Sequence, residues 1–179
     1  MDCLEQYTIP VKGITEGVHY FEFDVNKKFF EHFDILDVKK ADLKVNVELT
    51  YKNGNYTFKI KITGYVSLIC DVCLDVYKQK VLTDNTLYAS ENNNEDTEFD
   101  ENIIQISDIS NKVNISNEIY EFIVLSIPIK HQHPLDKNGN RTCNPEMLKR
   151  IESYSVINEQ NSDIDPRWEK LKKLKNGTS

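Results

Sequence analysis

The feature that most constrains the fold of this chain is a long alternation of apolar and polar residues on both sides of Asn53-Gly54. Apolar residues occupy every second position from 43 to 51 and, apart from Gly64, from 56 to 70. This two-residue period is typical of strands with one buried face, and an Asn-Gly pair favours the positive φ angles of a tight turn. The sequence therefore predicts a long antiparallel hairpin over residues 42–70, with a bulge or bend at Gly64.

Shorter elements are predicted on either side of this hairpin. Residues 18–25 are partly alternating and favour a strand, and residues 26–33 place aromatic side chains on one face of a short helix, as core packing. A second helix is expected to begin at Asn114, whose side chain can cap free amides, and to end before Pro128. Further strands are expected after the hairpin and over residues 103–106. These elements predict an α+β fold: a curved antiparallel β-sheet with two or three packed helices and a short C-terminal tail helix.

The C-terminal stretch differs in composition from the rest of the chain. A polar linker leads to Asp165-Pro166, which suits a helix cap and a first-turn proline, and Trp168 then begins an apolar stripe among lysines. A helix this short is marginal alone in water, so we expect it to dock on its own domain or on a partner. The sequence predicts one α+β domain over residues 1–157, with an acidic loop at 90–102, followed by a linker and an amphipathic basic tail helix over 158–179.

Cysteine and histidine spacing suggests a metal site. Cys70 and Cys73 form a Cys-x-x-Cys pair at the end of the hairpin, and His131-Gln132-His133 and Cys143 follow far downstream. Two pairs of thiolate and imidazole groups can form a closed tetrahedral zinc site, so a structural zinc ion is the predicted cofactor. The predicted ligands are Cys70, Cys73, His133 and Cys143, with His131 as the alternative imidazole. The competing interpretation is that the cysteines are simply buried and reduced.

Composition and missing motifs narrow the function classes. The chain has 179 residues and a formal net charge of −7, which weighs against a general nucleic-acid binder. No apolar run is long enough to cross a bilayer, and the N-terminus lacks the features of a signal peptide, so a cytoplasmic location is expected. No P-loop, dinucleotide fingerprint or Gly-x-Ser-x-Gly elbow occurs, so no enzyme is predicted.

Basic residues nevertheless gather locally. Residues 39–61 contain six lysines against only Asp42 and Glu48, which predicts a basic outer face on the hairpin. This face and the basic tail are the candidate partner-binding surfaces, because contact with phosphate needs a local basic patch. The candidate residues are Lys44, Lys52, Lys59, Lys61, Trp168, Lys172 and Lys173.

Three stretches, taken in order, carry a family resemblance. They are residues 9–30, beginning Ile-Pro-Val-Lys-Gly; residues 64–74, which end in Cys-x-x-Cys-Leu; and Ser-Ile-Pro at 126–128, followed by His133-Pro134 and Asp-Pro-Arg-Trp at 165–168. Together they resemble the YceD family, the large ribosomal RNA subunit accumulation proteins. Members are implicated in synthesis, processing or stability of large-subunit ribosomal RNA in bacteria and plastids, and no catalytic activity is established for them. Many relatives carry a second cysteine cluster after His-Pro, where this chain has only Cys143.

The resemblance implies a non-enzymatic ribosome biogenesis factor. Its expected partner is ribosomal RNA or a large-subunit ribosomal protein, with no membrane and no small-molecule substrate identified. An alternative from another class is a zinc-dependent or thiol-based redox enzyme that uses Cys70 and Cys73. A thioredoxin-like motif would place the pair at the start of a helix, whereas strand-like sequence lies on both sides here. A third hypothesis is a protein-interaction module whose docking element is the tail helix around Trp168.

Overall fold

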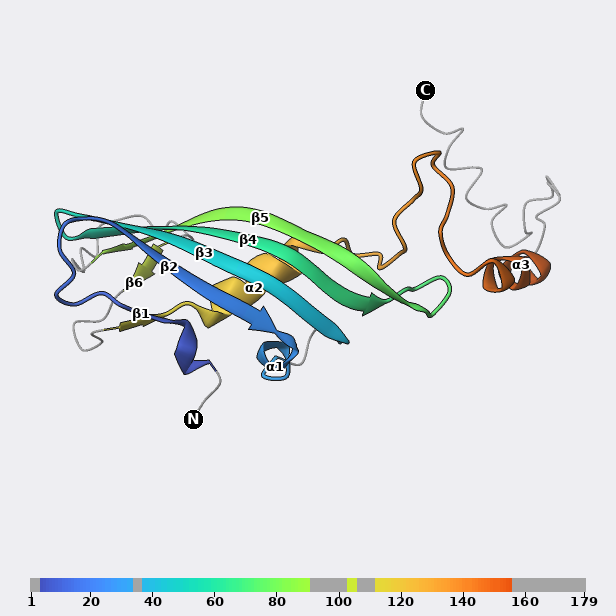
Figure 1. Cartoon of the computed structure of the whole chain (residues 1–179), viewed down its shortest axis with the longest axis horizontal. Helices are drawn as coiled ribbons and strands as arrows, with labels where there is room; N and C mark the ends of the chain where they lie inside the picture. The colour runs from blue at the N-terminus through green and yellow to red at the C-terminus, as the bar shows by residue number, and fades with distance from the viewer. Residues whose placement is uncertain (1–3, 34–36, 91–102, 106–111, 156–179) are drawn as a thin grey trace, which may run out of the picture.

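A computed structural model describes residues 4–33, 37–90, 103–105 and 112–155. Its main element is a five-stranded sheet in the order β2-β3-β4-β5-β6 (Figure 1). The strands are β2 (Gly17–Asn26), β3 (Lys40–Lys52), β4 (Asn55–Ile69), β5 (Val76–Ser90) and β6 (Ile103–Gln105). Neighbours from β2 to β5 are antiparallel, and β6 pairs parallel to β5. A second small sheet joins β1 (Thr8–Pro10) to β7 (Lys112–Asn114).

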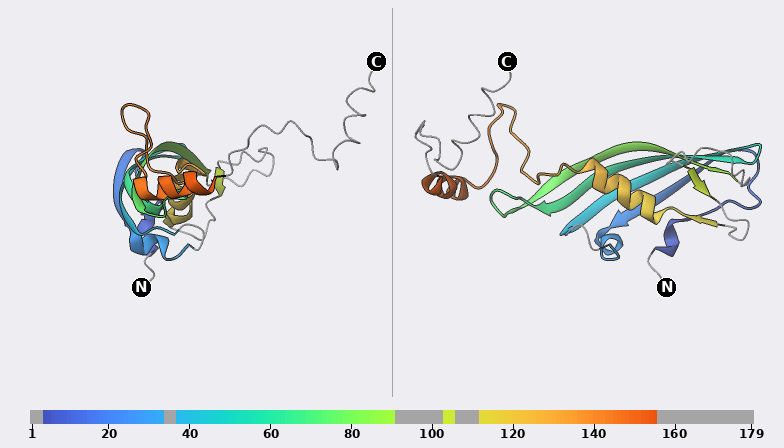
Figure 2. Two further views of the ribbon diagram at one scale, coloured as in Figure 1. Left: turned by 90° about the vertical axis from the view of Figure 1, so that its right-hand side faces the viewer. Right: turned by 180° about the vertical axis from the view of Figure 1, so that it is seen from behind.

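The helices lie at one face and at one end of the sheet. A 3-10 turn, η1 (Glu5–Tyr7), and α1 (Lys27–Phe30) flank it, and α2 (Ser116–Ser126) lies inside its curve (Figure 2). The last described helix is α3 (Pro145–Tyr154). The predicted α+β fold with a curved sheet is confirmed, although the parallel pairing of β6 was not expected. No helix in the described ranges is both long and apolar enough to span a membrane.

The predicted hairpin is confirmed. β3 and β4 pair without a break from Lys40↔Ser67 to Lys52↔Asn55. Asn53 and Gly54 form the turn with φ angles of 51° and 77°. Both central residues have positive φ, as a two-residue hairpin turn matched to the sheet twist requires.

Of the bulge or bend predicted at Gly64, the bulge is wrong. The register passes through Leu43↔Gly64 and Gly64↔Val81 with no extra residue. Glycine is needed there for two other reasons: its φ is +144°, and a Cβ would collide with the Asp42 carbonyl oxygen and lie 2.9 Å from the Leu43 Cα. The residue permits a close approach of two backbones, which only a residue without a side chain allows.

The core lies between the inner face of the sheet and the helices. Alternate residues of β3 and β4 are buried, and Ile119 and Ile123 of α2 pack against them. The predicted aromatic cluster is confirmed as core packing. Phe29 and Phe30 are buried, and the rings of Phe29 and Tyr7 meet edge to face with their centroids 4.9 Å apart. The two-residue period of the strands thus directs one face inward, and the outer face stays in water.

Helix boundaries differ from the predicted ones. Asn114 ends β7 instead of starting the helix, because its backbone pairs with Thr8. Its side chain accepts a hydrogen bond from the Ser116 amide at 2.9 Å and so still contributes near the start of α2. The helix predicted over 26–33 is shorter, Lys27–Phe30, with Asn26 as its cap.

One helix was missed, and part of the chain lies outside the description. Asn144 caps α3 through a bond from the Glu146 amide at 3.0 Å, and Pro145 follows it. This is the same cap-and-proline signature that predicted a helix at 165–166, so the signal was present. The tail predicted over 158–179 lies outside the described residues, as does the acidic loop of 90–102 apart from Ser90 in β5.

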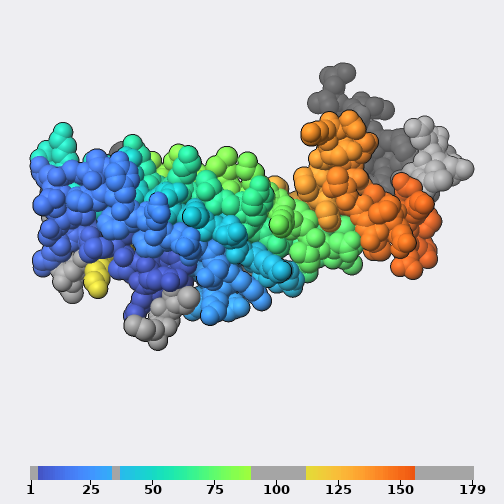
Figure 3. Space-filling model, in the orientation of Figure 1, coloured from blue at the N-terminus to red at the C-terminus, as the bar shows by residue number. Residues whose placement is uncertain are grey.

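Residues 128–155, here called the arm, leave the end of α2 and finish in α3. The arm extends beyond the end of the sheet where β4 turns into β5 (Figures 1 and 3). Of its side chains only that of Cys143 is buried. The arm therefore has almost no hydrophobic core of its own.

Candidate metal centre

The turn between β4 and β5 supplies the first two candidate ligands. The Leu74 amide donates to the Cys70 carbonyl at 2.9 Å, and the Cys70 amide donates to the Asp75 carbonyl at 2.9 Å. Leu74 adopts a positive φ of 63° to close this turn. The Val72 amide points at the Cys70 sulfur, 3.4 Å away. The strand phase carries Cys70 to the inner face, and both Cys70 and Cys73 are buried.

The arm brings the other two candidates to this turn. Asp71, in the turn, holds the arm with two hydrogen bonds. Its backbone amide donates to the His131 carbonyl, and its carboxylate accepts from the His131 amide, each at 2.7 Å. Two residues later the ring of His133 faces Cys73. The Thr142 hydroxyl donates to the Pro134 carbonyl at 2.7 Å, which closes the loop and returns the chain to Cys143.

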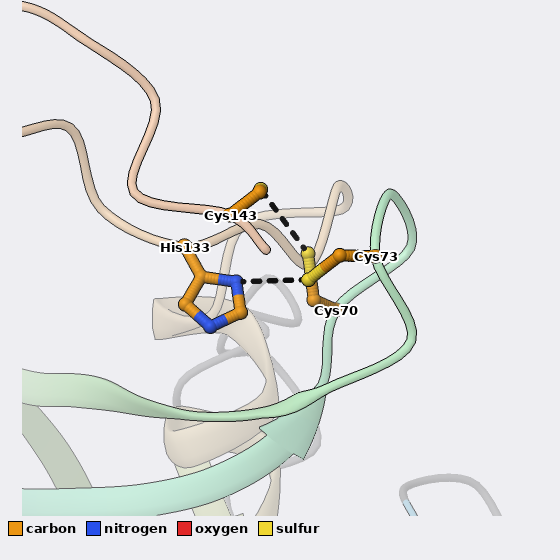
Figure 4. A group of neighbouring side chains, drawn as sticks. All are labelled: Cys70, Cys73, His133 and Cys143. Atoms are coloured by element: carbon orange, nitrogen blue, oxygen red, sulfur yellow. Dashed lines mark hydrogen bonds between the residues drawn. The ribbon is translucent and has the colours of Figure 1, made fainter. Parts of the chain in front are cut away.

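Four ligand atoms meet in this centre (Figure 4). The sulfurs of Cys70, Cys73 and Cys143 and a ring nitrogen of His133 all lie within 4.8 Å of one another. The Cys70 and Cys143 sulfurs are 3.8 Å apart, and the Cys73 sulfur lies 3.5 Å from His133 Nδ1. Zinc bonds in a tetrahedron would place two sulfurs about 3.8 Å apart and a sulfur and a nitrogen about 3.6 Å apart. This cluster could therefore hold a metal ion such as zinc.

The electrostatics of the thiols also suit a cation. Burial opposes ionisation of Cys70, but hydrogen bonds from the Cys73 and Val72 amides and from His133 outweigh it and lower the pKa of Cys70 to about 6. Burial, together with the neighbouring Cys70 and Cys73, raises the pKa of Cys143 to about 11. Burial first, and the neighbouring sulfurs second, thus favour the protonated form of Cys143. A bound divalent cation would offset the repulsion between the sulfurs and favour thiolate at every position.

The structure separates the two histidines. Only His133 places a ring nitrogen in the cluster, whereas His131 contributes its backbone to the Asp71 clamp. Sequence reasoning missed two supports of the centre, Asp71 and Asn144. The Asn144 amide group donates to the Asp75 carboxylate at 3.2 Å and so ties the start of α3 to the β4–β5 turn. The presence of Asp71 between the two cysteines gave no signal of this role, because its partner lies sixty residues away.

The predicted lysines lie apart from this centre. Lys44, Lys52, Lys59 and Lys61 are exposed on the outer face of the sheet. The neighbouring strands supply opposing carboxylates: Asp24 opposite Lys44, Asp84 opposite Lys61, and Glu48, which pairs with Lys59 at 3.4 Å. The basic face predicted from the hairpin alone is thus largely neutralised along these strands. Trp168, Lys172 and Lys173 lie outside the described residues.

Comparison with known families identifies the chain. The model of the large ribosomal RNA subunit accumulation protein YceD matches residues 58–175, more than half of the sequence. The chain belongs to the YceD family. The match begins in β4 and contains all four residues of the centre. Membership in the YceD family implies a role in accumulation of large-subunit ribosomal RNA. No curated protein and no solved structure matches the chain significantly.

Proposed function

We propose that this YceD-family protein supports the synthesis, processing or stability of large-subunit ribosomal RNA as a non-enzymatic biogenesis factor. It would act by binding RNA or a large-subunit ribosomal protein, in the cytoplasm. The family match over residues 58–175 is the observation that carries this proposal. The Cys70, Cys73, His133 and Cys143 centre would hold a structural zinc ion that fixes the arm to the sheet.

The make-up of the centre supports binding over catalysis. Four protein ligands complete a tetrahedral zinc site, which leaves no position for a substrate or a reactive water. All three cysteines of the centre are buried, so a substrate of a thiol-based redox enzyme would first have to displace the arm. The Cys70–Cys73 pair also lies in a turn between antiparallel strands, whereas the thioredoxin-like alternative needs a helix start.

Deletion of the gene tests the proposed role. We expect the deleted strain to contain less large-subunit ribosomal RNA relative to small-subunit RNA, and fewer large subunits in sedimentation profiles. Expression of the wild-type chain should restore both. Unchanged RNA ratios and unchanged subunit profiles in the deleted strain would contradict the proposal.

A further inference from the structure

The outer face of the sheet, opposite α2, is organised in cross-strand rows by the register. Going along the strands from the Asn53-Gly54 turn, one row contains Tyr20, Glu48 and Lys59, and the next contains Glu22, Lys61 and Asp84. In these rows acidic side chains match or outnumber lysines. A shallow hollow of about 250 Å³ in this region is lined by three carboxylates and two lysines. This half of the face offers no net attraction to phosphate.

The other half of the face has the opposite balance. Its members, here called the basic end, are Lys40, Asp42, Tyr65, Val76, Lys78 and Lys80. Ser67 lies between Lys40 and Lys78 in one row, and Tyr65 lies between Asp42 and Lys80 in the next. Three lysines thus face one carboxylate. Within the described part of the chain, no carboxylate comes within ion-pair distance of any of these three lysines.

An exposed aromatic ring lies in the middle of the basic end. Tyr65 is 51% exposed although it is on a central strand, and Val76, at 55%, is exposed on the neighbouring strand. An aromatic ring on an open sheet gives a nucleic-acid base a surface on which to stack, and lysines around it can contact the phosphates. This combination is the usual design of sheet surfaces that bind single-stranded RNA.

The surroundings of the basic end strengthen its positive field. The candidate metal centre holds the arm beside it, and the arm exposes five basic side chains against three carboxylates. The carboxylates of Asp71 and Asp75, on the β4–β5 turn, are directed at the arm, where they accept hydrogen bonds from the neutral His131 and Asn144 amides. β5 ends at Ser90, ten residues or roughly 33 Å along the strand from Lys80, and the acidic stretch of 91–102 follows Ser90 in the sequence. The acidic stretch therefore joins the sheet at the end of β5 away from the basic end.

We propose that the basic end binds single-stranded RNA, with Tyr65 stacked on a base and Lys40, Lys78 and Lys80 in contact with phosphates. This inference rests on the proposed function and selects RNA over a ribosomal protein as the direct partner. It also gives the metal centre a role in binding, because the centre fixes the β4–β5 end of the sheet and the basic arm beside it.

The test measures RNA binding by the full-length protein. The probe is a labelled 20-nucleotide RNA without self-complementarity, followed by fluorescence anisotropy over a series of salt concentrations. We expect Tyr65→Ala to weaken binding about tenfold, which is the usual effect of losing one stacked base. We expect Lys78→Gln with Lys80→Gln to flatten the slope of log affinity against log salt by about 0.7 for each lost contact.

Matched control variants lie on the other half of the same face. Tyr20→Ala removes an even more exposed ring, and Lys59→Gln with Lys61→Gln removes two lysines that face carboxylates. These controls should leave affinity and salt slope unchanged, and all variants should keep the wild-type thermal melting temperature. Equal losses of RNA affinity in the basic-end variants and in the control variants would overturn the inference, and so would a wild-type protein that binds no RNA at low salt. If gene deletion still lowered large-subunit RNA in that case, the proposed function would stand with a protein partner.

Discussion

The body of the molecule, formed by the sheet with α1 and α2, and the arm of residues 128–155 are stabilised by different interactions. In the body, alternate residues of long paired strands are buried, and α2 adds Ile119 and Ile123 to the same core. In the arm only Cys143 is buried, and the chain is positioned by hydrogen bonds to Asp71 and Asp75 and by the four-residue centre.

This difference shows where a metal would matter most. Ordering a segment costs roughly 1–2 kcal/mol per residue in backbone entropy, which buried apolar surface must normally offset. The body has that surface and the arm does not. Zinc binding to thiolates and imidazole can supply the missing free energy, because the ligands are brought together only in the folded chain. The body and the arm should therefore lose their structure independently when each is perturbed.

The largest effect is expected from removal of a ligand in the arm. Cys143→Ser should reduce bound zinc from about one ion per chain to nearly none, because three remaining ligands leave the site incomplete. Trypsin should then cut the arm at least tenfold faster at Lys130, Lys137 or Arg141, while the body keeps its melting transition. Elemental analysis and mass spectrometry of the fragments give both readouts.

A matched pair of histidine variants serves as the control for this prediction. His133→Gln should act like Cys143→Ser, whereas His131→Gln should keep its zinc, because His131 contributes only backbone groups near the centre. Zinc retained in Cys143→Ser, or simultaneous unfolding of the body, would contradict the division between the two regions.

The next largest effect should appear in the body at Gly64. Gly64→Ala forces a Cβ against the backbone of β3 and strains a φ of +144°, so we expect a loss on the order of 3 kcal/mol in the free energy of unfolding. Gly17→Ala is the control: Gly17 has a similar φ of +138° but no atom within 4 Å of an added Cβ. Urea unfolding of both variants separates the two causes, and equal losses would show that the close approach is unimportant.

The sequence predicts the body better than the arm for a physical reason. The alternation from residue 43 to residue 70 and the turn at Asn53-Gly54 are local signals, and the structure confirms both. Local signals also underlie the caps of α1 and α3, although the second was overlooked. Gly64 was recognised as special, but its role depends on a neighbouring strand that the local pattern does not place.

The candidate centre shows the same limit. The residue types and spacing predicted the four members, because few side chains bind zinc and all of them are recognisable in a sequence. The choice between His131 and His133 depends on a backbone clamp to Asp71, which no spacing reveals. The hairpin pattern also did not reveal the neighbours of the hairpin lysines: Asp24, opposite Lys44, and Asp84, opposite Lys61, come from the strands on either side.

A smaller effect on stability is expected when a capping asparagine is replaced by alanine in each of the two regions. Asn26 caps α1 in the body and Asn144 caps α3 in the arm, each through one side-chain bond to a backbone amide. Asn26→Ala should lower the global free energy of unfolding by about 1 kcal/mol. Asn144→Ala removes both the cap of α3 and the bond to the Asp75 carboxylate, and it should leave global unfolding unchanged and instead speed amide hydrogen exchange in residues 145–154. A global loss from Asn144→Ala would mean that the arm and the body unfold together.

The smallest predicted effect concerns pH and Glu118, in the first turn of α2. One oxygen of its carboxylate is buried and has no hydrogen-bond partner among the residues that the structure describes, and burial, with the charge of Glu121, raises the pKa of Glu118. A folded pKa above the unfolded one means that the ionised group opposes folding at neutral pH and that this penalty disappears as pH falls through the folded pKa. Glu118→Gln should therefore stabilise the body at pH 7 by a few tenths of a kcal/mol, because solvent screens the half-buried group, and should give no advantage near pH 4.

The same change in pH should act in the opposite direction on the arm. Protons compete with a metal for thiolate and imidazole, so acidification weakens zinc binding and loosens the arm while it relieves the penalty at Glu118. Urea unfolding at pH 7 and pH 4, with the exposed Glu22→Gln as the control, measures the effect at Glu118, and trypsin cleavage after brief exposure to each pH measures the effect on the arm. A destabilising Glu118→Gln at pH 7 would show that the carboxylate is stabilised by its surroundings. An arm equally protected at both pH values would show that hydrogen bonds to Asp71 and Asp75, and not a metal, hold it to the sheet.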